Sequence, residues 1–381
     1  MMAALRGTTL RAAVAATAGA ASWKNSEKRP LCFGGRDLRG NLHPHSPGAG
    51  RMQPTKVPAP SASSEADELD NLPLFRFGVI ADVQYCDIPD GFNFTGTTRR
   101  HYRGSLATAR KASEYWRRRR AELVCNLGDI IDGQCRDALA GNPGGGTSES
   151  ALAAVLAALE SGVGRDVPFV HLIGNHELYN FDRDALAAKL RTRRPRTDPA
   201  GLSPRSATNM ANHSGATGEF NEKYGDAEFY AVRCCPGWRL VVLDPFQNAV
   251  IGSEEGSEAW SRSFEFLRSK NKNIQDANAL KGGGWFEGLP RRLKNFVPYN
   301  GGFGEPQLRW LQEELSDADA CGDRVVLLTH VIIHPAACDG STMAWDYEKA
   351  LRLCQGHPCV AAVLAGHDHK GGYHYSREVQ S

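Results

Sequence analysis

The sequence predicts an α/β fold, because short apolar and β-branched runs alternate with segments of helical periodicity. Six such runs occur, at residues 77–80, 123–127, 169–173, 240–243, 325–328 and 360–364. Continuous runs of this length are typical of strands buried on both faces. Residues 106–116 and 308–315 show helical spacing, and Pro306 stands where a helix start favours proline. We therefore expect helices covering the faces of the sheet.

Length and charge limit the classes of partner. The 381 residues suit one enzyme-sized domain with a tail. With 45 basic and 43 acidic residues the net charge is +2, which does not favour a general nucleic-acid binder. The longest wholly apolar run, residues 151–159, is far shorter than the roughly 20 residues that a membrane span needs. We expect a monomer with no nucleic-acid or membrane partner.

Residues 1–70 differ from the rest, being rich in Ala, Gly, Ser, Pro and Arg, with no acidic residue before Glu27. This composition predicts a disordered extension ahead of a domain at 71–381. Arg6 and Arg11 before an Ala-rich run are typical of a transit peptide, which would direct the protein to a chloroplast or mitochondrion. A secretory signal, a plain extension of a cytoplasmic protein, or a true start at Met52 are the alternatives.

The ten cysteines lack the Cys-x-x-Cys pairs of a structural zinc site. A chain of this size does not need disulfides to stabilise its core. We expect reduced, mostly buried thiols.

Ligand-type side chains follow five of the six predicted strands. They form the groups Asp82-x-Gln84, Gly128-Asp129-x-x-Asp132, Gly174-Asn175-His176-Glu177, Thr329-His330 and Gly366-His367-x-His369. One such group alone is typical of a cap, a turn or a structural histidine. Five in one order, each after a buried strand, predict a functional site at one edge of the sheet.

Two neighbouring divalent cations repel each other, so a carboxylate must bridge them and further oxygen and nitrogen ligands must complete the site. Asp129 is suited to bridge. Alternate residues of an extended chain point the same way, so Asp82 with Gln84, and His367 with His369, can each present two ligands together. The residues thus predict a centre for two cations.

This set of groups resembles the calcineurin-like metallophosphoesterases. Four blocks resemble more narrowly the manganese-dependent ADP-ribose/CDP-alcohol diphosphatases: residues 77–84 with 90–94, 127–133, 300–303, and 366–369 ahead of 371–373. The resemblance covers residues 74–375 and implies a four-layer α+β architecture, a β-sandwich flanked by helices. Those relatives continue beyond the position of Ser381, so we expect a C-terminally truncated form of this fold.

The resemblance implies a ligand set for each metal. One metal would be held by Asp82, Gln84, Asp129 and His369, and the second by Asp129, Asn175, His330 and His367. Gln84 stands where most of the family has histidine. An amide oxygen hardens the site, which favours Mn²⁺, with Mg²⁺ or Fe as alternatives.

The implied reaction is attack on phosphorus by a metal-activated water, with His176 donating a proton to the departing oxygen. Asp132 would orient a histidine. Phe94 and Tyr179 are candidates for substrate stacking, although such aromatics often serve packing.

The expected function is hydrolysis of the diphosphate bond of ADP-ribose and CDP-alcohols such as CDP-choline, giving AMP or CMP and a phosphorylated product. The first alternative is a metallophosphoesterase for a cyclic nucleotide, phosphodiester or phosphomonoester. The second is an inactive metal-binding or scaffold protein of the same fold.

Overall fold

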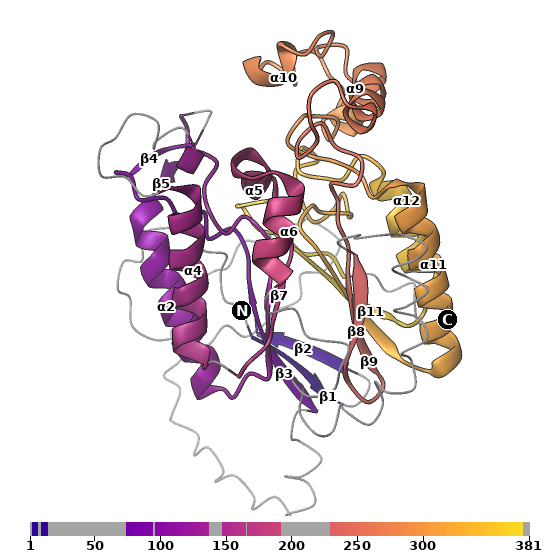
Figure 1. Ribbon diagram of the computed structural model, residues 1–381. Coiled ribbons are helices and arrows are strands. Elements are labelled where there is room, and N and C mark those ends of the chain that lie inside the picture. Colours follow the sequence, from indigo (N-terminus) through magenta and orange to yellow (C-terminus); the bar gives the residue numbers. More distant parts are fainter. Residues whose placement is uncertain are drawn as a thin grey trace, which may run out of the picture. The chain divides into compact units, whose positions relative to one another are not determined.

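The computed structural model describes residues 2–6, 9–13, 74–93, 96–136, 147–164, 166–191 and 229–375. Two main β-sheets organise this part of the chain (Figure 1). The first has the strand order β2-β1-β3-β6-β7 and the second the order β11-β10-β9-β8.

The first sheet is built from β-α-β units. Strands β3 (Phe75–Ile80), β6 (Leu123–Asn126) and β7 (Phe169–His171) are parallel neighbours. Helices α2 (Tyr102–Arg118) and α4 (Ser148–Val163) connect them in turn. Because the three strands are parallel, their carboxyl ends lie at the same edge of the sheet.

The second sheet repeats this pattern. Strands β9 (Trp238–Val242), β10 (Arg324–Thr329) and β11 (Val360–Ala365) are parallel, and β8 (Tyr230–Cys235) pairs antiparallel with β9. Helix α11 (Gly304–Cys321) precedes β10, and α12 (Tyr347–Gly356) precedes β11. The six predicted strands and the two predicted helices are all present.

One hydrophobic core lies between the two sheets. Phe77, Leu123 and Val170 of the first sheet pack in one buried cluster with Leu240 and Leu328 of the second. Alternate strand residues face the opposite way and are covered by helices, α2 and α4 on one side and α11 and α12 on the other (Figure 1). The predicted β-sandwich flanked by helices is confirmed.

Strands β1 (Met2–Arg6) and β2 (Thr9–Ala13) were not expected. They form an antiparallel pair, and β1 also pairs antiparallel with β3. A strand edge offers unpaired N–H and C=O groups, which a nearby chain segment can satisfy. These ten residues therefore differ from the expected unpacked extension, whereas residues 14–73 lie outside the described ranges.

Smaller elements surround the carboxyl ends of the strands. The short strands β4 (Gly91–Phe92) and β5 (Arg99–Arg100) pair with each other. The helices are α5 (Asn175–Asn180), α6 (Arg183–Arg191), α9 (Glu258–Lys270), α10 (Ala279–Gly282) and the 3-10 helix η3 (Arg291–Leu293). The α9–α10 region has a small core of its own around Leu267, Ile274 and Trp345.

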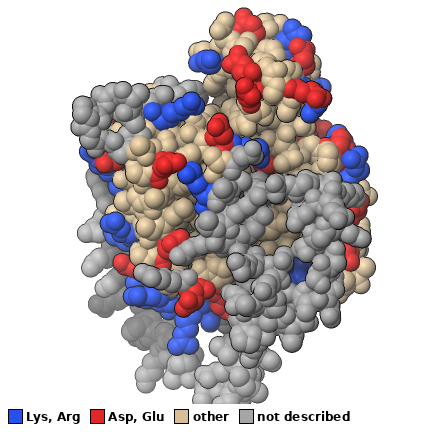
Figure 2. All heavy atoms as spheres, in the orientation of Figure 1, with Lys and Arg blue, Asp and Glu red and all other residues tan. Residues whose placement is uncertain are grey.

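The distribution of surface charge and the polarity of the helices agree with what the composition predicts. On the face in Figure 2, basic and acidic side chains of the described residues are interspersed, in line with the net charge of +2. Among the described helices, none combines the length and apolar character that crossing a bilayer requires.

Candidate metal centre

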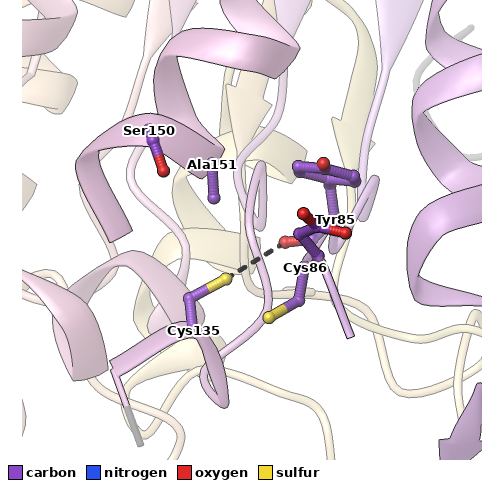
Figure 3. Close-up of a pocket in the computed structure, with 6 residues that line it drawn as sticks. Tyr85, Cys86, Cys135, Ser150 and Ala151 are labelled. Atoms are coloured by element: carbon purple, nitrogen blue, oxygen red, sulfur yellow. Dashed lines mark hydrogen bonds between the residues drawn. The ribbon is translucent and has the colours of Figure 1, made fainter. Parts of the chain in front are cut away.

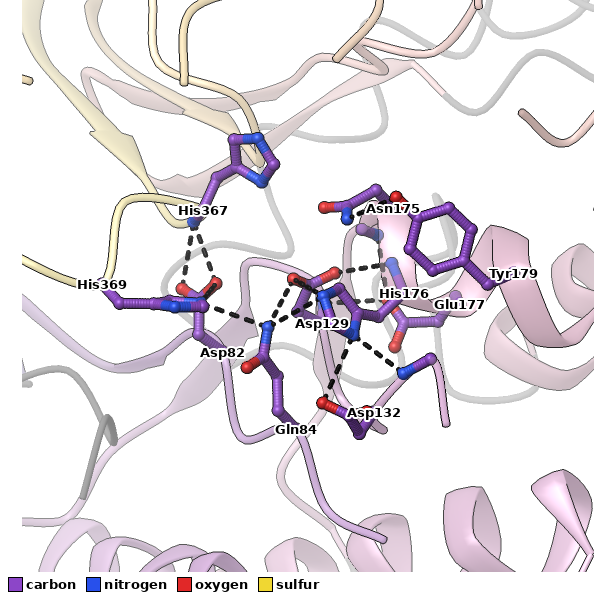
Figure 4. A network of polar contacts seen from close by, with 12 residues as sticks. Asp82, Gln84, Asp129, Asp132, Asn175, His176, Glu177, Tyr179, His367 and His369 are labelled. Carbon is purple, nitrogen blue, oxygen red and sulfur yellow. Dashed lines mark hydrogen bonds and ion pairs between the residues drawn. The ribbon is translucent and has the colours of Figure 1, made fainter. Parts of the chain in front are cut away.

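The seven predicted metal ligands lie together where β3, β6, β7, β10 and β11 end. Figure 4 labels six of the seven, all except His330, and they come from segments that follow strands of both sheets. Asp82, Gln84, Asp129, Asn175 and His330 are almost completely buried. The predicted convergence of ligand-type residues is therefore present, with two sheets contributing instead of one.

The backbone is strained at this site. Asp82, Gln84, Asp129 and His367 have φ angles of 55°, 45°, 54° and 71°, in the left-handed region that non-glycine residues avoid. Among the other described non-glycine residues only Arg120 shares this conformation. Each such residue costs on the order of 1–3 kcal/mol. Concentration of this strain in four ligand-type residues indicates that their placement serves a function.

Two glycines permit the close approach of the ligand loops. A Cβ atom at Gly174 would lie 2.2 Å from Asp129 Oδ1, and one at Gly128 would lie 2.8 Å from His330 Nδ1. Gly128 also has a φ of 99°. A side chain at either position would push Asp129 or His330 out of place.

Glu177 holds the Asp129 loop through its carboxylate. One oxygen accepts hydrogen bonds from the N–H groups of Ile130 (2.6 Å) and Ile131 (3.1 Å), and the other from those of Asp129 (2.8 Å) and Gly174 (2.9 Å). Burial and the charge of Asp129 raise the pKa of Glu177 to about 7, while the N–H donors favour its ionised form. Glu177 thus ties the segments that follow β6 and β7 to each other.

The carboxylates and histidines form two clusters that share one residue. Asp129, His330 and His367 make the first, and Asp82, Asp129 and His369 make the second. Within each cluster one candidate ligand atom per residue lies within 4.8 Å of the others. Asp129 belongs to both, which is the arrangement that a bridging carboxylate requires.

Hydrogen bonds orient His330. Its Nδ1 lies 2.7 Å from the carbonyl oxygen of Leu127 and can only donate there, so the proton is on Nδ1. Its Nε2 is left facing Asn175 Oδ1 at 3.2 Å and Asp129 Oδ1 at 3.4 Å. This is the orientation that a metal-binding histidine needs.

His367 is oriented by Asn300. Both N–H bonds of the Asn300 amide are used, by the carbonyl groups of Asn295 (2.9 Å) and Ser341 (2.8 Å). Asn300 Oδ1 therefore accepts from His367 Nε2 at 2.8 Å, which leaves Nδ1 of His367 unprotonated. His369 comes from the same loop and places Nε2 3.3 Å from Asp82 Oδ1.

Gln84 presents its amide nitrogen to the centre. Nε2 donates to Asp129 Oδ2 at 2.9 Å and lies 3.1 Å from His369 Nε2. Its oxygen, Oε1, accepts a hydrogen bond of 2.6 Å from Arg100 of β5. Coordination of a cation by Gln84 would require this amide to turn over and release Arg100.

The electrostatics of the centre favour bound positive charge. Burial alone would raise the pKa of Asp129, but the imidazoles of His176 and His330 hold it well below its usual range. Burial alone would lower the pKa of His330, but the charge of Asp129 raises it to about 9. Burial and the charge of His330 hold the pKa of His367 well below normal. Buried carboxylate oxygens and imidazole nitrogens are a donor set that fits divalent transition metals.

His176 stands beside the clusters and belongs to neither. Its Nδ1 accepts a hydrogen bond from the N–H of Gly133 at 2.8 Å, so the neutral ring carries its proton on Nε2. That nitrogen faces Gln84 Nε2 at 3.3 Å and Asp129 Oδ2 at 3.8 Å. Asp132 Oδ2 lies 3.6 Å from Nδ1, close enough for charge attraction but too far for a hydrogen bond.

Substrate stacking by Phe94 and Tyr179 stays a prediction, and the structure describes only Tyr179. Tyr179 is half-buried, and its hydroxyl accepts a hydrogen bond from Asn175 Nδ2 at 3.2 Å. This bond turns Asn175 Oδ1 towards His330. The ring of Tyr179 also lies 5.5 Å from that of His176. Phe94 lies outside the described residues, and its role in substrate binding stays a prediction.

Three residues of the site had no assigned role in the sequence. Glu177 and Asn300 stood inside recognised blocks, but only their contacts reveal that they orient Asp129 and His367. Arg100 lies 16 positions beyond Gln84 and carried no signal apart from its place after the 90–94 block.

The sandwich and its two carboxylate–imidazole clusters are those of a dinuclear phosphoesterase. The chain belongs to the calcineurin-like phosphoesterase family, whose model matches residues 75–371. Within it, the chain is 39% identical to a manganese-dependent ADP-ribose/CDP-alcohol diphosphatase of Danio rerio, over 79% of this chain and 83% of that protein. The protein of the same name from Homo sapiens is 35% identical, over 83% of this chain and 82% of that protein.

A solved structure also supports membership of the chain in this family. The crystal structure of a dimetal phosphatase from Danio rerio superposes with a TM-score of 0.64 and 37% identity, covering 80% of this chain and 85% of that one.

Proposed function

We propose that this protein is a manganese-dependent hydrolase that cleaves the diphosphate bond of ADP-ribose and of CDP-alcohols such as CDP-choline. The products are AMP or CMP and a phosphorylated alcohol or sugar. The observation that carries the proposal is the sharing of Asp129 between two ligand clusters. The relatives of 33–39% identity, all named for this activity, support the choice of substrate.

Two cations would be held by the residues of these clusters and their amide neighbours. Asp82, Gln84, Asp129 and His369 would hold one, and Asp129, Asn175, His330 and His367 the other. Bound at such a site, paired divalent cations lower the pKa of water and neutralise phosphoryl oxygens. After its amide has turned over, Gln84 would offer an oxygen in place of the more usual imidazole nitrogen, which favours Mn²⁺ over Zn²⁺.

His176 is the proton donor in this proposal. The N–H of Gly133 keeps Nδ1 unprotonated, so the ring holds its proton on Nε2, the nitrogen that faces Asp129. From there the proton can pass to the phosphate oxygen that leaves when the diphosphate bond breaks. Asp132 stabilises the ring through its charge, and Tyr179 fixes the Asn175 amide.

The substrate is a small nucleotide, and we expect the domain at 71–381 to act as a monomer without nucleic acid or membrane. On the face that Figure 2 shows, the basic and acidic side chains of the described residues are interspersed, so this face does not favour a polyanionic partner. Light scattering of the purified chain tests its oligomeric state.

The proposed reaction is tested with the full-length chain, freed of metal and then supplied with Mn²⁺. ADP-ribose, CDP-choline, a cyclic nucleotide and p-nitrophenyl phosphate are offered separately, and products are separated by chromatography. We expect AMP from ADP-ribose and CMP from CDP-choline, with slow turnover of the other two. Preference for the cyclic nucleotide or the monoester would indicate instead a metallophosphoesterase for those substrates. Bound Mn²⁺ without any turnover would indicate an inactive metal-binding or scaffold protein of the same fold.

A further inference from the structure

Two cysteine side chains meet beside the candidate metal centre. Cys86 and Cys135 are 2% and 1% exposed, and both side chains line one small cavity. The thiol of Cys135 donates to the carbonyl oxygen of Tyr85, the residue before Cys86, at 3.3 Å. Figure 3 shows the two sulfur atoms turned towards one another. Both cysteines are free thiols in this structure.

The two thiols join the two segments that carry the centre. Cys86 follows Gln84 by two residues, and Cys135 follows Asp132 by three. The segments are already paired through their backbones, since the N–H of Gln84 donates to Asp129 O at 2.9 Å and that of Asp132 to Tyr85 O at 2.9 Å. A bond between the sulfurs would therefore close a short bridge next to the ligands.

A cavity gives small reagents room beside the sulfurs. It has a volume of about 200 Å³ and is lined by Tyr85, Cys86, Asp87, Cys135, Ser150 and Ala151 (Figure 3). Asp87 and Ser150 are exposed, so the lining reaches the surface of the described residues. A volume of this size admits water-sized molecules, hydrogen peroxide included.

We propose that Cys86 and Cys135 are a redox modification site, at which a hydroperoxide converts the two thiols into a reversible disulfide. One thiolate attacks a peroxide oxygen, which gives a sulfenic acid and, after protonation of the leaving hydroxide, one water. The second thiol displaces the sulfenic hydroxyl as a second water and forms the S–S bond. In sum, two thiols and one hydrogen peroxide give one disulfide and two waters, and an added reductant reverses the change.

Oxidation should lower the diphosphatase activity, and in that respect the inference rests on the proposed function. A covalent S–S bond of about 2 Å is shorter than any contact between two unbonded thiols, so the segments at 84–86 and 132–135 must move closer to each other. Displacements on the order of 1 Å at a reacting centre cost about 100-fold in rate. We expect the disulfide to reduce kcat for ADP-ribose by roughly tenfold to 100-fold.

The test oxidises the full-length, metal-free protein with a small excess of hydrogen peroxide. After removal of the oxidant, one portion is digested without reduction for mass spectrometry, and another is loaded with Mn²⁺ and assayed. We expect a peptide pair joined through Cys86 and Cys135, a lower kcat, and recovery of kcat with a phosphine reductant. The joined peptide does not depend on activity, so it reports on the site even where the proposed substrates fail.

Matched variants separate this pair from the remaining cysteines. C86S and C135S should each resist inactivation by peroxide, and C321S, which removes an exposed thiol, should remain as sensitive as the natural protein. Where a serine variant does not fold, C86A or C135A replaces it. The proposal is overturned when no joined peptide forms, when the peptide forms without a change in kcat, or when C86S and C135S remain sensitive.

Discussion

The carboxylate of Glu177 accepts the backbone N–H of Asp129 at 2.8 Å, and the same carboxylate holds the N–H groups of Ile130, Ile131 and Gly174. Asp129 is the residue shared by the two ligand clusters. The position of the shared ligand is thus set by a buried acid of helix α5 whose carboxylate accepts four backbone N–H groups.

Glu177→Gln should destabilise the protein. Glutamine keeps one acceptor oxygen and turns an NH₂ group towards two of the four backbone donors. Two buried N–H groups then lose their partner, at about 1–3 kcal/mol each, so we expect a loss of about 2–6 kcal/mol in the free energy of unfolding. Denaturant unfolding of the metal-free protein measures this change.

Glu258→Gln is the control for this substitution, because Glu258 is exposed and, within the described part of the chain, its ion pair is with Arg262 along helix α9. We expect it to change stability by less than about 0.5 kcal/mol. Equal effects of the two substitutions would contradict the anchoring role of Glu177.

His176→Ala should keep bound metal and lose turnover. The ring lies outside both ligand clusters, and its Nε2 proton faces the centre. Loss of a general acid lowers kcat by about 10²–10⁴-fold. Metal content and kcat for ADP-ribose are measured on the same preparation. A variant that loses its Mn²⁺ would make His176 a ligand.

Arg100→Gln should lower kcat/KM for ADP-ribose. Its guanidinium lies beside Gln84, 2.6 Å from Oε1, so it brings positive charge to the centre and, once released by Gln84, is free to bind a phosphate oxygen of the substrate. Loss of a hydrogen bond between charged groups costs about 1.5–3 kcal/mol, or roughly 10- to 100-fold.

Arg99→Gln is the matched control, since Arg99 precedes Arg100 on β5 and its side chain is 64% exposed. We expect its steady-state constants to stay close to those of the natural protein. A similar loss of kcat/KM in the two variants would show that the total positive charge of β5 matters, and not the position of Arg100 beside Gln84.

Asn300→Ala should weaken Mn²⁺ binding. Without Asn300 Oδ1, His367 Nε2 loses the partner that leaves Nδ1 unprotonated. Removal of such outer contacts costs about 10–100-fold in metal affinity. Isothermal titration with Mn²⁺ measures the change, and Asn278→Ala, at an exposed position before α10, serves as the control. Unaltered affinity in Asn300→Ala would remove Asn300 from the metal site.

Structural features that depend on the periodicity of apolar residues could be predicted from the sequence. Residues 77–80, 123–127 and 325–328 could be assigned to strands because burial on both faces leaves an unbroken apolar run. Ligand-type side chains after parallel strands meet because the carboxyl ends of those strands share an edge. Strand β8 escaped prediction since Arg233 interrupts its apolar pattern.

Contacts between distant positions could not be predicted in this way. Asn300 and His367 are 67 positions apart, and Arg100 reaches Gln84 from a two-residue strand with no apolar pattern. Their partners depend on how loops fold back on the sheets, which no local spacing encodes. The left-handed backbone at Asp82 and Asp129 is likewise imposed by tertiary structure, against the local preference of aspartate.

The central claim is that Asp129 joins two cations in one centre. The most direct test is electron paramagnetic resonance of the protein loaded with two equivalents of Mn²⁺, beside the Asp129→Asn variant. We predict exchange coupling between the two ions in the natural protein, and loss of bound Mn²⁺ in the variant because both clusters lose their shared charge. A spectrum of isolated, uncoupled Mn²⁺ ions in the natural protein, or full Mn²⁺ loading of Asp129→Asn, would contradict the account.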